Sequence, residues 1–113
     1  MGVTAENIAD LYGIDRNEQD ALGVLSHNRA RAAIQEGLFK EEIVPVVIKS
    51  RKGETVFEID ERPMDTNMEK MAKLRPVFKK DGVITAGTSS PLNAAATSMV
   101  LMSKETAKKK GIK

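Results

Sequence analysis

The chain has 113 residues, which fits one ordinary domain, and its 41% hydrophobic and 30% charged residues are a normal balance for a soluble protein. Its formal net charge of +2, from 18 basic and 16 acidic residues, is too small to argue for a nucleic-acid partner. The absence of cysteine excludes disulfides and thiolate metal sites, and no apolar run approaches the ~20 residues of a membrane span. We therefore expect a cytoplasmic protein with no nucleic-acid partner, no membrane partner and no bound metal.

Two helices are predicted in the N-terminal third, over residues 5–12 and 15–36. Each begins with a residue that can cap free backbone amides and ends before a glycine that supplies a left-handed conformation. These residues are, in chain order, Thr4, Gly13, Asp15 and Gly37. Glu18 lies three residues after Asp15, which is the spacing of a capping box. The apolar stripe of the second helix, expected to pack inward, holds Ala21, Leu22, Leu25, Ala32 and Ala33, with Ser26 and Arg29 interrupting it.

The middle of the chain is predicted to form a β-hairpin. Residues 43–48 are apolar and largely β-branched, and Pro45 among them places this strand at an edge, because proline has no amide hydrogen. Residues 52–54 are typical of a turn, and residues 55–59 of a second strand.

Shorter elements are predicted in the C-terminal half. In chain order they are helix 68–74 with Met68, Met71 and Ala72 inward, turn 79–82, strand 83–85, loop 87–91, a helix start at 93–96, buried strand 97–102, and a last helix after Ser103 ending at Gly111. Residues 97–102 are apolar enough for a buried strand, although propensity alone does not separate strand from helix there. The last helix is favoured because Glu105 lies in its first turn and lysines 108–110 lie in its last turn, as the helix dipole prefers.

Nine short motifs occur in one order along the chain. They are Met1-Gly-Val-Thr-Ala-Glu-Asn7, Arg16-Asn-Glu-Gln-Asp20, Ser26-His27, Phe39-Lys-Glu-Glu-Ile-Val-Pro45, Asp60-Glu-Arg62, Lys73-Leu-Arg-Pro-Val-Phe78, Thr85-Ala-Gly87, Ser90 and Leu101-Met-Ser103. Together they resemble the middle third of a thiolase, the family of acetyl-CoA acetyltransferases and 3-ketoacyl-CoA thiolases. The resemblance covers essentially the whole chain, and it implies an acyltransferase of the kind used in fatty acid metabolism. Gly-Thr-Ser-Ser at 87–90 looks slightly more like the 3-ketoacyl-CoA branch.

The resemblance implies an α+β fold that is part of a thiolase. Residues 1–86 would be most of the loop domain, a helical unit with a small β-hairpin that covers the active site and binds coenzyme A. Residues 87–113 would be the last loop, strand and helix of the N-terminal catalytic half. The family's nucleophilic Cys would lie upstream of this segment, and its catalytic His and second Cys downstream. The chain is therefore expected to contain no catalytic residue and to be inactive alone.

Coenzyme A has a phosphorylated adenosine head and a long neutral pantetheine arm, so its site needs cations at one end and a narrow apolar channel with a few polar contacts. By resemblance, Arg62 would lie near the nucleotide phosphates and Ser90 would contact the pantetheine amides. His27 and Lys70 would stand close to the nucleotide end. The channel would be lined by Val77, Phe78, Ala86, Leu92 and Met1.

These residues also have plain structural interpretations. Phe78 is typical of a core aromatic, and Ser90 in a Gly/Ser/Pro loop is typical of a turn residue. Arg62 beside Pro63 is typical of a solvated charge. His27, alone on a helix, is typical of a surface or packing histidine, because a metal site needs further ligands.

Three functions follow. The first is a thiolase fragment that contributes the coenzyme A binding region, with acyl-CoA and the remaining thiolase segments or subunits as partners. The second is a free-standing acyl-CoA binding module or one subunit of a split thiolase; the chain could also self-associate, because 97–102 would lack its sheet. The third, a basic nucleic-acid protein, is disfavoured because no aromatic platform for base stacking exists. Pro91 and Ala94-Ala95, where the family usually has Gly and Asp-Gly, put full thiolase function in doubt.

Overall fold

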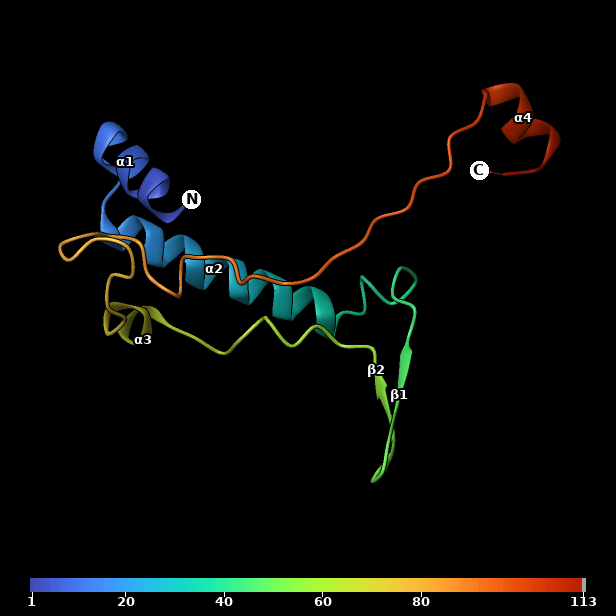
Figure 1. Ribbon diagram of the computed structural model, residues 1–113, viewed down its shortest axis with the longest axis horizontal. Helices are drawn as coiled ribbons and strands as arrows, with labels where there is room; N and C mark the ends of the chain where they lie inside the picture. The colour runs from blue at the N-terminus through green and yellow to red at the C-terminus, as the bar shows by residue number, and fades with distance from the viewer. Residues whose placement is uncertain (113) are drawn as a thin grey trace.

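The computed structural model describes residues 1–112, which form four helices and one two-stranded antiparallel sheet. In chain order the elements are α1 (Gly2–Tyr12), α2 (Arg16–Gln35), β1 (Val46–Ser50), β2 (Gly53–Phe57), α3 (Met68–Ala72) and α4 (Lys104–Lys109). Figure 1 shows α1, α3 and the start of α2 gathered at one end, the hairpin near the other end of α2, and α4 set apart. The radius of gyration is 19.8 Å, against about 13 Å for a compact domain of about this size, so the arrangement is open.

Helix α1 begins earlier than the sequence predicts. It starts at Gly2, so Thr4 lies inside the helix and the expected cap at Thr4 is wrong. The amide of Ala5 already donates to the Met1 carbonyl at 3.0 Å, and the Phe78 ring lies so close to Gly2 that a methyl group there would collide with it. This tertiary contact favours an additional N-terminal turn. The other end is as predicted, because Gly13 closes the helix with a φ of 64°.

Helix α2 has the predicted ends but packs through a different face. The capping box is confirmed: the Glu18 amide donates to Asp15 Oδ1 at 2.8 Å, and the Asp15 amide donates to Glu18 Oε2 at 3.1 Å. The expected apolar stripe is wrong, because Leu22 is 66% exposed and Leu25 43% exposed. The covered residues include a polar or small series three or four positions apart, Arg16, Asp20, Gly23, His27 and Arg31, and also the apolar residues Val24, Ala30, Ala33 and Ile34.

The physical reason is that α2 packs against segment 64–74 through polar and backbone contacts. Arg16 and His27 each bond to backbone groups of this segment, and Arg31 Nη1 pairs with Asp65 Oδ1 at 2.9 Å. Gly23 allows the close approach, because a methyl group there would lie 2.6 Å from Met71 Cε. Polar contacts and the small size of Gly23 therefore help to determine which face of α2 is covered against segment 64–74.

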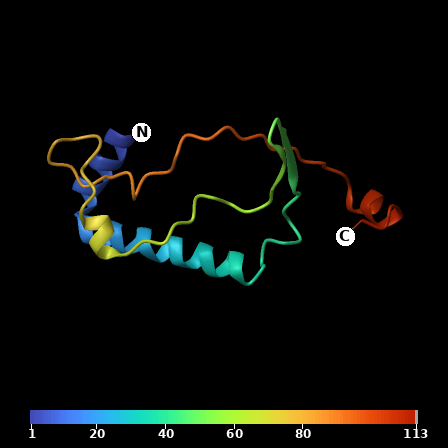
Figure 2. The same cartoon turned by 90° about the horizontal axis from the view of Figure 1, so that it is seen from below.

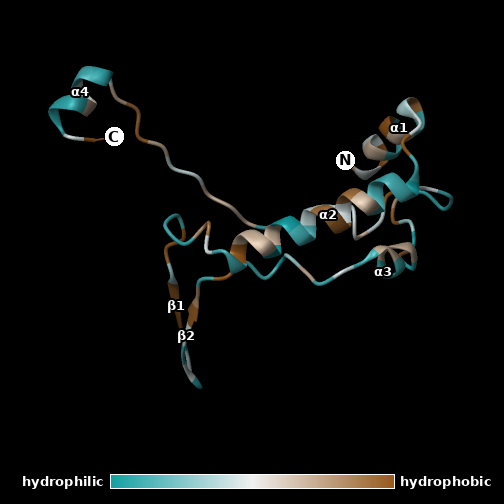
Figure 3. Cartoon of the chain, turned by 180° about the vertical axis from the view of Figure 1, so that it is seen from behind, coloured by the Kyte–Doolittle hydropathy of each residue, from teal (hydrophilic) through white to brown (hydrophobic). Residues whose placement is uncertain are grey.

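The predicted hairpin is confirmed, with shifted ends. Val46 of β1 pairs with Phe57 of β2, so the ladder begins after Pro45, which has no amide hydrogen to donate, rather than at residue 43. The second strand accordingly ends at Phe57 rather than at residue 59. Every residue of both strands is exposed. Figure 3 shows apolar residues along both strands, and the hairpin therefore offers uncovered apolar surface.

Helix α3 is shorter than predicted and buries one of its three expected core residues. Asn67 caps it by accepting from the Lys70 amide at 2.9 Å. Met71 is 3% exposed, but Met68 is 40% exposed and Ala72 is also exposed, so their predicted burial is wrong. One short turn presents only one side chain to α2, and Met71 occupies that position.

After α3, the predicted turn at 79–82 is confirmed by a hydrogen bond from the Gly82 amide to the Lys79 carbonyl at 3.2 Å. The predicted strand 83–85 is reduced to a single antiparallel bridge between Pro76 and Thr85. Proline has no amide to donate, so the pairing does not extend into a ladder.

The segment 91–103 has no helix or strand, so the helix start at 93–96 and the buried strand at 97–102 are wrong for this chain. Leu92, Val100 and Leu101 are 103%, 81% and 86% exposed. A strand needs a neighbour for its amides and carbonyls, and no described residue pairs with this segment. Helix α4 is as predicted: Ser103 Oγ accepts from the Thr106 amide at 3.2 Å, and Gly111 follows with a φ of 65°.

Over residues 1–112, none of the helices combines the length and apolar character needed to cross a membrane. In the same residues, no group of three or more His, Cys, Asp or Glu is placed to hold a metal ion.

Candidate functional site

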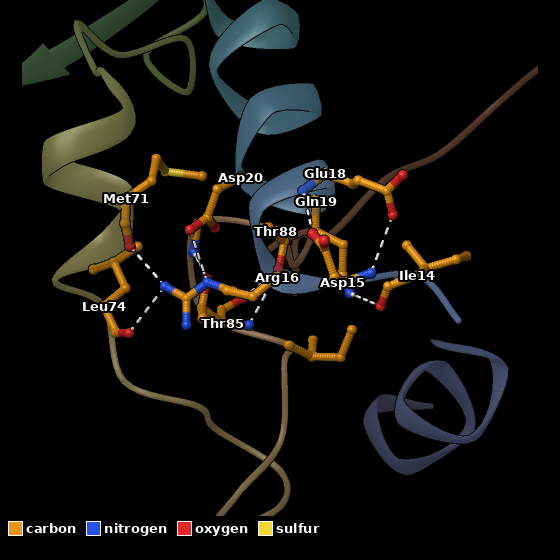
Figure 4. A network of polar contacts seen from close by, with 12 residues as sticks. Ile14, Asp15, Arg16, Glu18, Gln19, Asp20, Met71, Leu74, Thr85 and Thr88 are labelled. Carbon is orange, nitrogen blue, oxygen red and sulfur yellow. Dashed lines mark hydrogen bonds and ion pairs between the residues drawn. The ribbon is translucent and has the colours of Figure 1, made fainter. Parts of the chain in front are cut away.

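The side chain of Arg16 ties α2 to the end of α3 (Figure 4). Its Nε donates to Asp20 Oδ2 at 2.8 Å, one turn along α2. Its Nη2 donates to the carbonyls of Met71 at 2.7 Å and Leu74 at 3.0 Å, and the Met71 carbonyl also accepts from the Leu74 amide at 3.0 Å. Asp20 is 1% exposed, so the guanidinium compensates a buried charge. The pair fixes the point from which the following loop starts.

Two glycines let the loop after α3 approach the helices at backbone distance. A methyl group at Gly87 would lie 2.7 Å from Leu74 Cδ1 and from Met71 Sδ. A methyl group at Gly23 would lie 2.6 Å from Met71 Cε and 3.3 Å from the Gly87 carbonyl oxygen. Met71 is thereby enclosed between α2 and the loop, and residues 87–91 are held beside α2.

Thr85 organises this loop through its own hydrogen bonds. It is 0% exposed, and its amide donates to Thr88 Oγ1 at 3.0 Å. Its carbonyl accepts from Ser89 Oγ at 2.7 Å, and its Oγ1 accepts from the Gly87 amide at 3.2 Å. The loop therefore has a defined shape, with Ser90 directly after the last of these contacts.

A cavity of about 460 Å³ lies between α2 and this loop, and we call it the α2–loop pocket. It is lined by Gln19, Leu22, Gly23, Ser26, His27, Gly87, Thr88, Ser89, Ser90 and Pro91. The ten lining residues carry four hydroxyl groups, one amide and one imidazole and include no Asp, Glu, Lys or Arg, and the hydroxyls of Thr88 and Ser89 also bond to Thr85. Such a lining can donate to and accept from neutral amides and hydroxyls, and it suits a neutral polar ligand segment better than a phosphate.

Of the residues predicted from the sequence, the structure brings His27 and Ser90 together in this pocket. His27 Nδ1 accepts from the Met64 amide at 3.1 Å. The proton of the neutral ring is then on Nε2, which is left free to donate. Ser90 is exposed and therefore accessible to a ligand.

The predicted channel residues lie outside the pocket lining. Phe78 packs on Gly2 at the start of α1, which brings it near exposed Met1, and the Val77 amide donates to the Ile84 carbonyl at 3.0 Å. Ala86 is exposed in the turn after Thr85, and Leu92 is exposed two residues beyond Ser90. All five offer apolar surface that a ligand can reach: Met1, Val77, Phe78, Ala86 and Leu92.

The two predicted cations, Arg62 and Lys70, also lie outside the pocket. The backbone amide of Arg62 donates to Asp60 Oδ1 at 2.9 Å. Arg62 is exposed, so its guanidinium is accessible to a ligand. Lys70 Nζ donates to the Asp65 carbonyl at 3.1 Å, and its side chain is 58% exposed. The structure thus separates the cations from the uncharged pocket.

Sequence reasoning missed several lining residues, above all Ser26, Thr88 and Ser89. A signal for Ser26 was present, because it interrupts the apolar stripe of α2 where a packing helix would carry leucine. No comparable signal identified Thr88 and Ser89, whose position depends on the approach of the loop to Gly23. A second cavity, of about 820 Å³ near the base of the hairpin, contains none of the predicted site residues.

Comparison with known proteins gives a consistent match. The family model for the thiolase N-terminal domain matches residues 1–105. The chain is 57% identical to an acetyl-CoA acetyltransferase of Syntrophomonas wolfei, covering all of this chain and 28% of that protein. It is 50% identical to a beta-ketothiolase of Cupriavidus necator, covering all of this chain and 29% of that protein.

Solved structures agree with this match. The crystal structure of the Bacillus anthracis acetyl-CoA acetyltransferase matches with a TM-score of 0.92 at 49% identity, covering all of this chain and 29% of that one. Human mitochondrial 3-ketoacyl-CoA thiolase matches with a TM-score of 0.68 at 44% identity, covering 74% of this chain and 21% of that one. The chain thus spans less than a third of the length of these proteins. The resemblance drawn from the motifs is confirmed, and the chain belongs to the thiolase family, as part of its N-terminal domain.

Proposed function

We propose that this chain forms the coenzyme A binding region of a thiolase-type acyltransferase and is inactive by itself. Residues 1–86 would be most of the loop domain. Residues 87–113, of which Lys113 lies outside the described residues, would be the end of the N-terminal catalytic half. The α2–loop pocket is the single observation that carries the proposal, because it joins Ser90 and His27 in an uncharged, hydroxyl-rich cavity.

The chemistry of coenzyme A supports this assignment. Its pantetheine arm is neutral and carries amide groups, which match hydroxyl and imidazole partners better than charged ones. The Ser90 hydroxyl would bond to these amides, and His27 Nε2 would donate to a ligand oxygen. The phosphates at the other end would be reached by the exposed cations Arg62 and Lys70. The exposed apolar side chains around Phe78 would line the channel.

The chain alone is expected to be inactive because it lacks the cysteine nucleophile that thiolase chemistry needs. Thiolase chemistry transfers an acyl group through a cysteine thiolate, and this sequence has none. Its one histidine, His27, has Nδ1 occupied by the Met64 amide and is therefore not available as a base at that nitrogen. Acyl transfer would require the remaining thiolase segments or subunits as partners. One subunit of a split thiolase would have the same site, and mixing with a chain that supplies the cysteines would restore turnover.

The binding experiment is a titration of the isotope-labelled chain with coenzyme A, followed by NMR. We expect a dissociation constant on the order of millimolar, because the chain spans less than a third of its relatives and would supply only part of the site. Ser90→Ala should weaken binding at all salt concentrations, whereas Arg62→Ala should weaken it less at high salt, where a phosphate contact is already screened. Ser98→Ala and Arg29→Ala, both at exposed positions, are the matched controls.

Two results would contradict the proposal. Tight binding that neither Ser90→Ala nor Arg62→Ala affects would place the ligand elsewhere. Turnover of acetoacetyl-CoA by the purified chain, free of contaminating enzyme, would contradict the predicted inactivity.

A further inference from the structure

A buried carboxylate on α1, which the coenzyme A site does not use, holds the loop that leads to the pocket. Glu6 is 1% exposed. Its Oε2 accepts from the Val83 amide at 3.0 Å, and its Oε1 accepts from the Ile84 amide at 3.1 Å. A methyl group at Gly82 would collide with this carboxylate, so the absence of a side chain there makes room for it. One carboxylate therefore binds two consecutive backbone amides.

Glu6 is the central one of three contacts on a single face of α1. Gly2, Glu6 and Asp10 are spaced four residues apart, which places them on the same side of a helix. Gly2 lies against the Phe78 ring, and Asp10 Oδ2 accepts from Lys79 Nζ at 2.8 Å. This face of α1 thus holds the turn between residues 78 and 84 at three points, and Glu6 makes the only buried contact of the three.

Burial of a carboxylate is costly unless it is fully hydrogen-bonded, so a leucine at this position would pack α1 more simply. The carboxylate is explained by the two amides, which point toward α1 and would be unpaired without it. The contact orients the backbone at Val83 and Ile84, which an apolar side chain could not do. Glu6 therefore determines the orientation of the loop backbone at Val83 and Ile84 as well as its distance from α1.

A short run of hydrogen bonds connects these amides to the pocket. Thr85 follows Ile84 directly and is 0% exposed. Its carbonyl accepts from Ser89 Oγ at 2.7 Å, and Ser90 is the next residue. Glu6 itself is not among the residues that line the α2–loop pocket. A displacement of Ile84 would consequently move Ser90 without any change in the residues that touch the ligand.

We propose that Glu6 is a positioning residue for the α2–loop pocket. By binding the amides of Val83 and Ile84, its carboxylate sets the place of Ser90, so affinity for coenzyme A depends on a side chain that does not touch the ligand. The inference rests on the proposed function, because it takes coenzyme A as the ligand of this pocket.

The first test replaces the carboxylate with a group of the same shape in the full chain. In Glu6→Gln, the side-chain NH₂ meets a backbone amide donor, so one of the two bonds is lost. We expect hydrogen exchange at whichever of the Val83 and Ile84 amides loses its bond to be roughly tenfold faster or more, the usual scale for losing a bond to a charged group. The Ser90 amide signal should shift, and the coenzyme A dissociation constant should rise by roughly the same factor. Glu41→Gln, at an exposed position, is the matched control.

The second test disturbs the same contact from the other side. Gly82→Ala places a methyl group where the Glu6 carboxylate lies, so it should displace the carboxylate and weaken binding as Glu6→Gln does. The double variant should bind about as weakly as either single variant, because both changes break one contact and their effects should not add. If Glu6→Gln loses its helical circular dichroism, Glu6→Asp replaces it. This variant keeps the charge but is one methylene shorter and should hold at most one amide.

The outcomes separate the inference from the proposed function. A lower melting temperature with an unchanged dissociation constant in Glu6→Gln would overturn the inference, because the role would be structural only. Unchanged exchange at Val83 and Ile84 would also overturn it. Failure of the unaltered chain to bind coenzyme A would instead overturn the proposed function, and with it the ligand named here. Faster exchange, a shifted Ser90 signal and weaker binding, without additivity, would support Glu6 as a positioning residue.

Discussion

Two regions of the molecule differ in whether they bury any residues. Residues 1–35 and 67–90, which we call the clamp cluster, contain all the residues buried in the described part of the chain: Glu6, Ala9, Asp20, Met71, Ile84 and Thr85. Residues 91–112, which we call the extended segment, bury none. Figures 1 and 2 show the extended segment leading away from the cluster, with α4 at its far end.

The difference does not follow apolar content. Leu92, Val100 and Leu101 are almost fully exposed, whereas Glu6, Asp20 and Thr85 are at most 1% exposed. Glu6 and Thr85 have hydrogen-bond partners within the cluster, and Asp20 has one through Oδ2 while its Oδ1 has none, whereas no described residue pairs with the backbone of the extended segment. Burial in this chain is therefore decided by the availability of partners, and apolar side chains stay exposed where none is present.

The largest expected effect comes from Arg16→Met. This change leaves the buried Asp20 carboxylate without its guanidinium and removes the side-chain hydrogen bonds to the carbonyls of Met71 and Leu74. Removing one partner of a buried ion pair costs about 3–5 kcal/mol, which is a large share of the stability of a small domain. Urea unfolding followed by circular dichroism should show the cluster largely unfolded before denaturant is added. Arg29→Met, on the exposed side of α2, is the control and should change stability by about 0.5 kcal/mol or less.

An unchanged unfolding curve for Arg16→Met would mean that the cluster does not depend on its polar contacts. Apolar packing alone would then account for the burial of the clamp cluster.

Local signals predicted most of the helix ends, although not the start of α1 or the end of α3. Asp15 with Glu18, Gly13 and Ser103 acted as expected, because a cap needs only the few residues around it. Such caps form both in the clamp cluster, at Gly13 and Asp15, and in the extended segment, at Ser103. The hairpin was also predictable, since its turn and strands are adjacent in sequence.

Long-range features were not predictable from the residues alone. Leu22 and Leu25 look like the packing face of α2, yet the covered face is set by Arg16 reaching carbonyls more than 50 residues away. Residues 97–102 look like a buried strand, but a strand forms only beside another, and no described residue supplies one. Of the site, Ser90 and His27 were identified by family resemblance and meet in one pocket, whereas the supporting roles of Glu6, Gly23 and Gly87 depend on tertiary contact.

A smaller effect is expected from Gly87→Ala. The new methyl group would lie 2.7 Å from Leu74 Cδ1 and from Met71 Sδ, so either the loop or the buried Met71 must move. Overpacking of this kind costs about 1–3 kcal/mol in the free energy of unfolding. Ser98→Ala in the extended segment is the matched change and should cost almost nothing, because Ser98 is exposed. Equal urea midpoints for the two variants would contradict the expectation that the chain is tightly packed at Gly87 and unpacked at Ser98.

The extended segment should affect association rather than folding. Unpaired, apolar backbone can pair with another copy of itself, and Leu101 lies in the middle of such a stretch. Leu101→Lys should leave the urea midpoint of the cluster unchanged and weaken self-association roughly tenfold, the scale expected for losing one buried leucine. Sedimentation velocity over a range of concentrations measures this. A strictly monomeric unaltered chain, or a cluster that Leu101→Lys destabilises, would contradict the separation of the two regions.

The smallest expected effect concerns the surface contact between Lys79 and Asp10 at the edge of the clamp cluster. The hydrogen bond to Asp10 raises the pKa of Lys79 above its ordinary value of 10.5, against an opposing effect of desolvation and with added attraction from Asp10 and Glu6. Since the folded pKa is raised, the contribution of this contact is fully present below the unfolded pKa, about 10.4, and is lost as pH rises through the folded pKa. The unaltered chain should therefore have a slightly higher urea midpoint than Lys79→Met at neutral pH, and the difference should disappear once the pH has risen through the raised folded pKa of Lys79. It should also shrink in 1 M salt, because the Asp10 side chain is 70% exposed and the contact is screened. Lys109→Met, on α4 in the extended segment, should show no difference at any pH. A midpoint difference for Lys79→Met that persisted at high pH would assign the effect to side-chain packing rather than to charge.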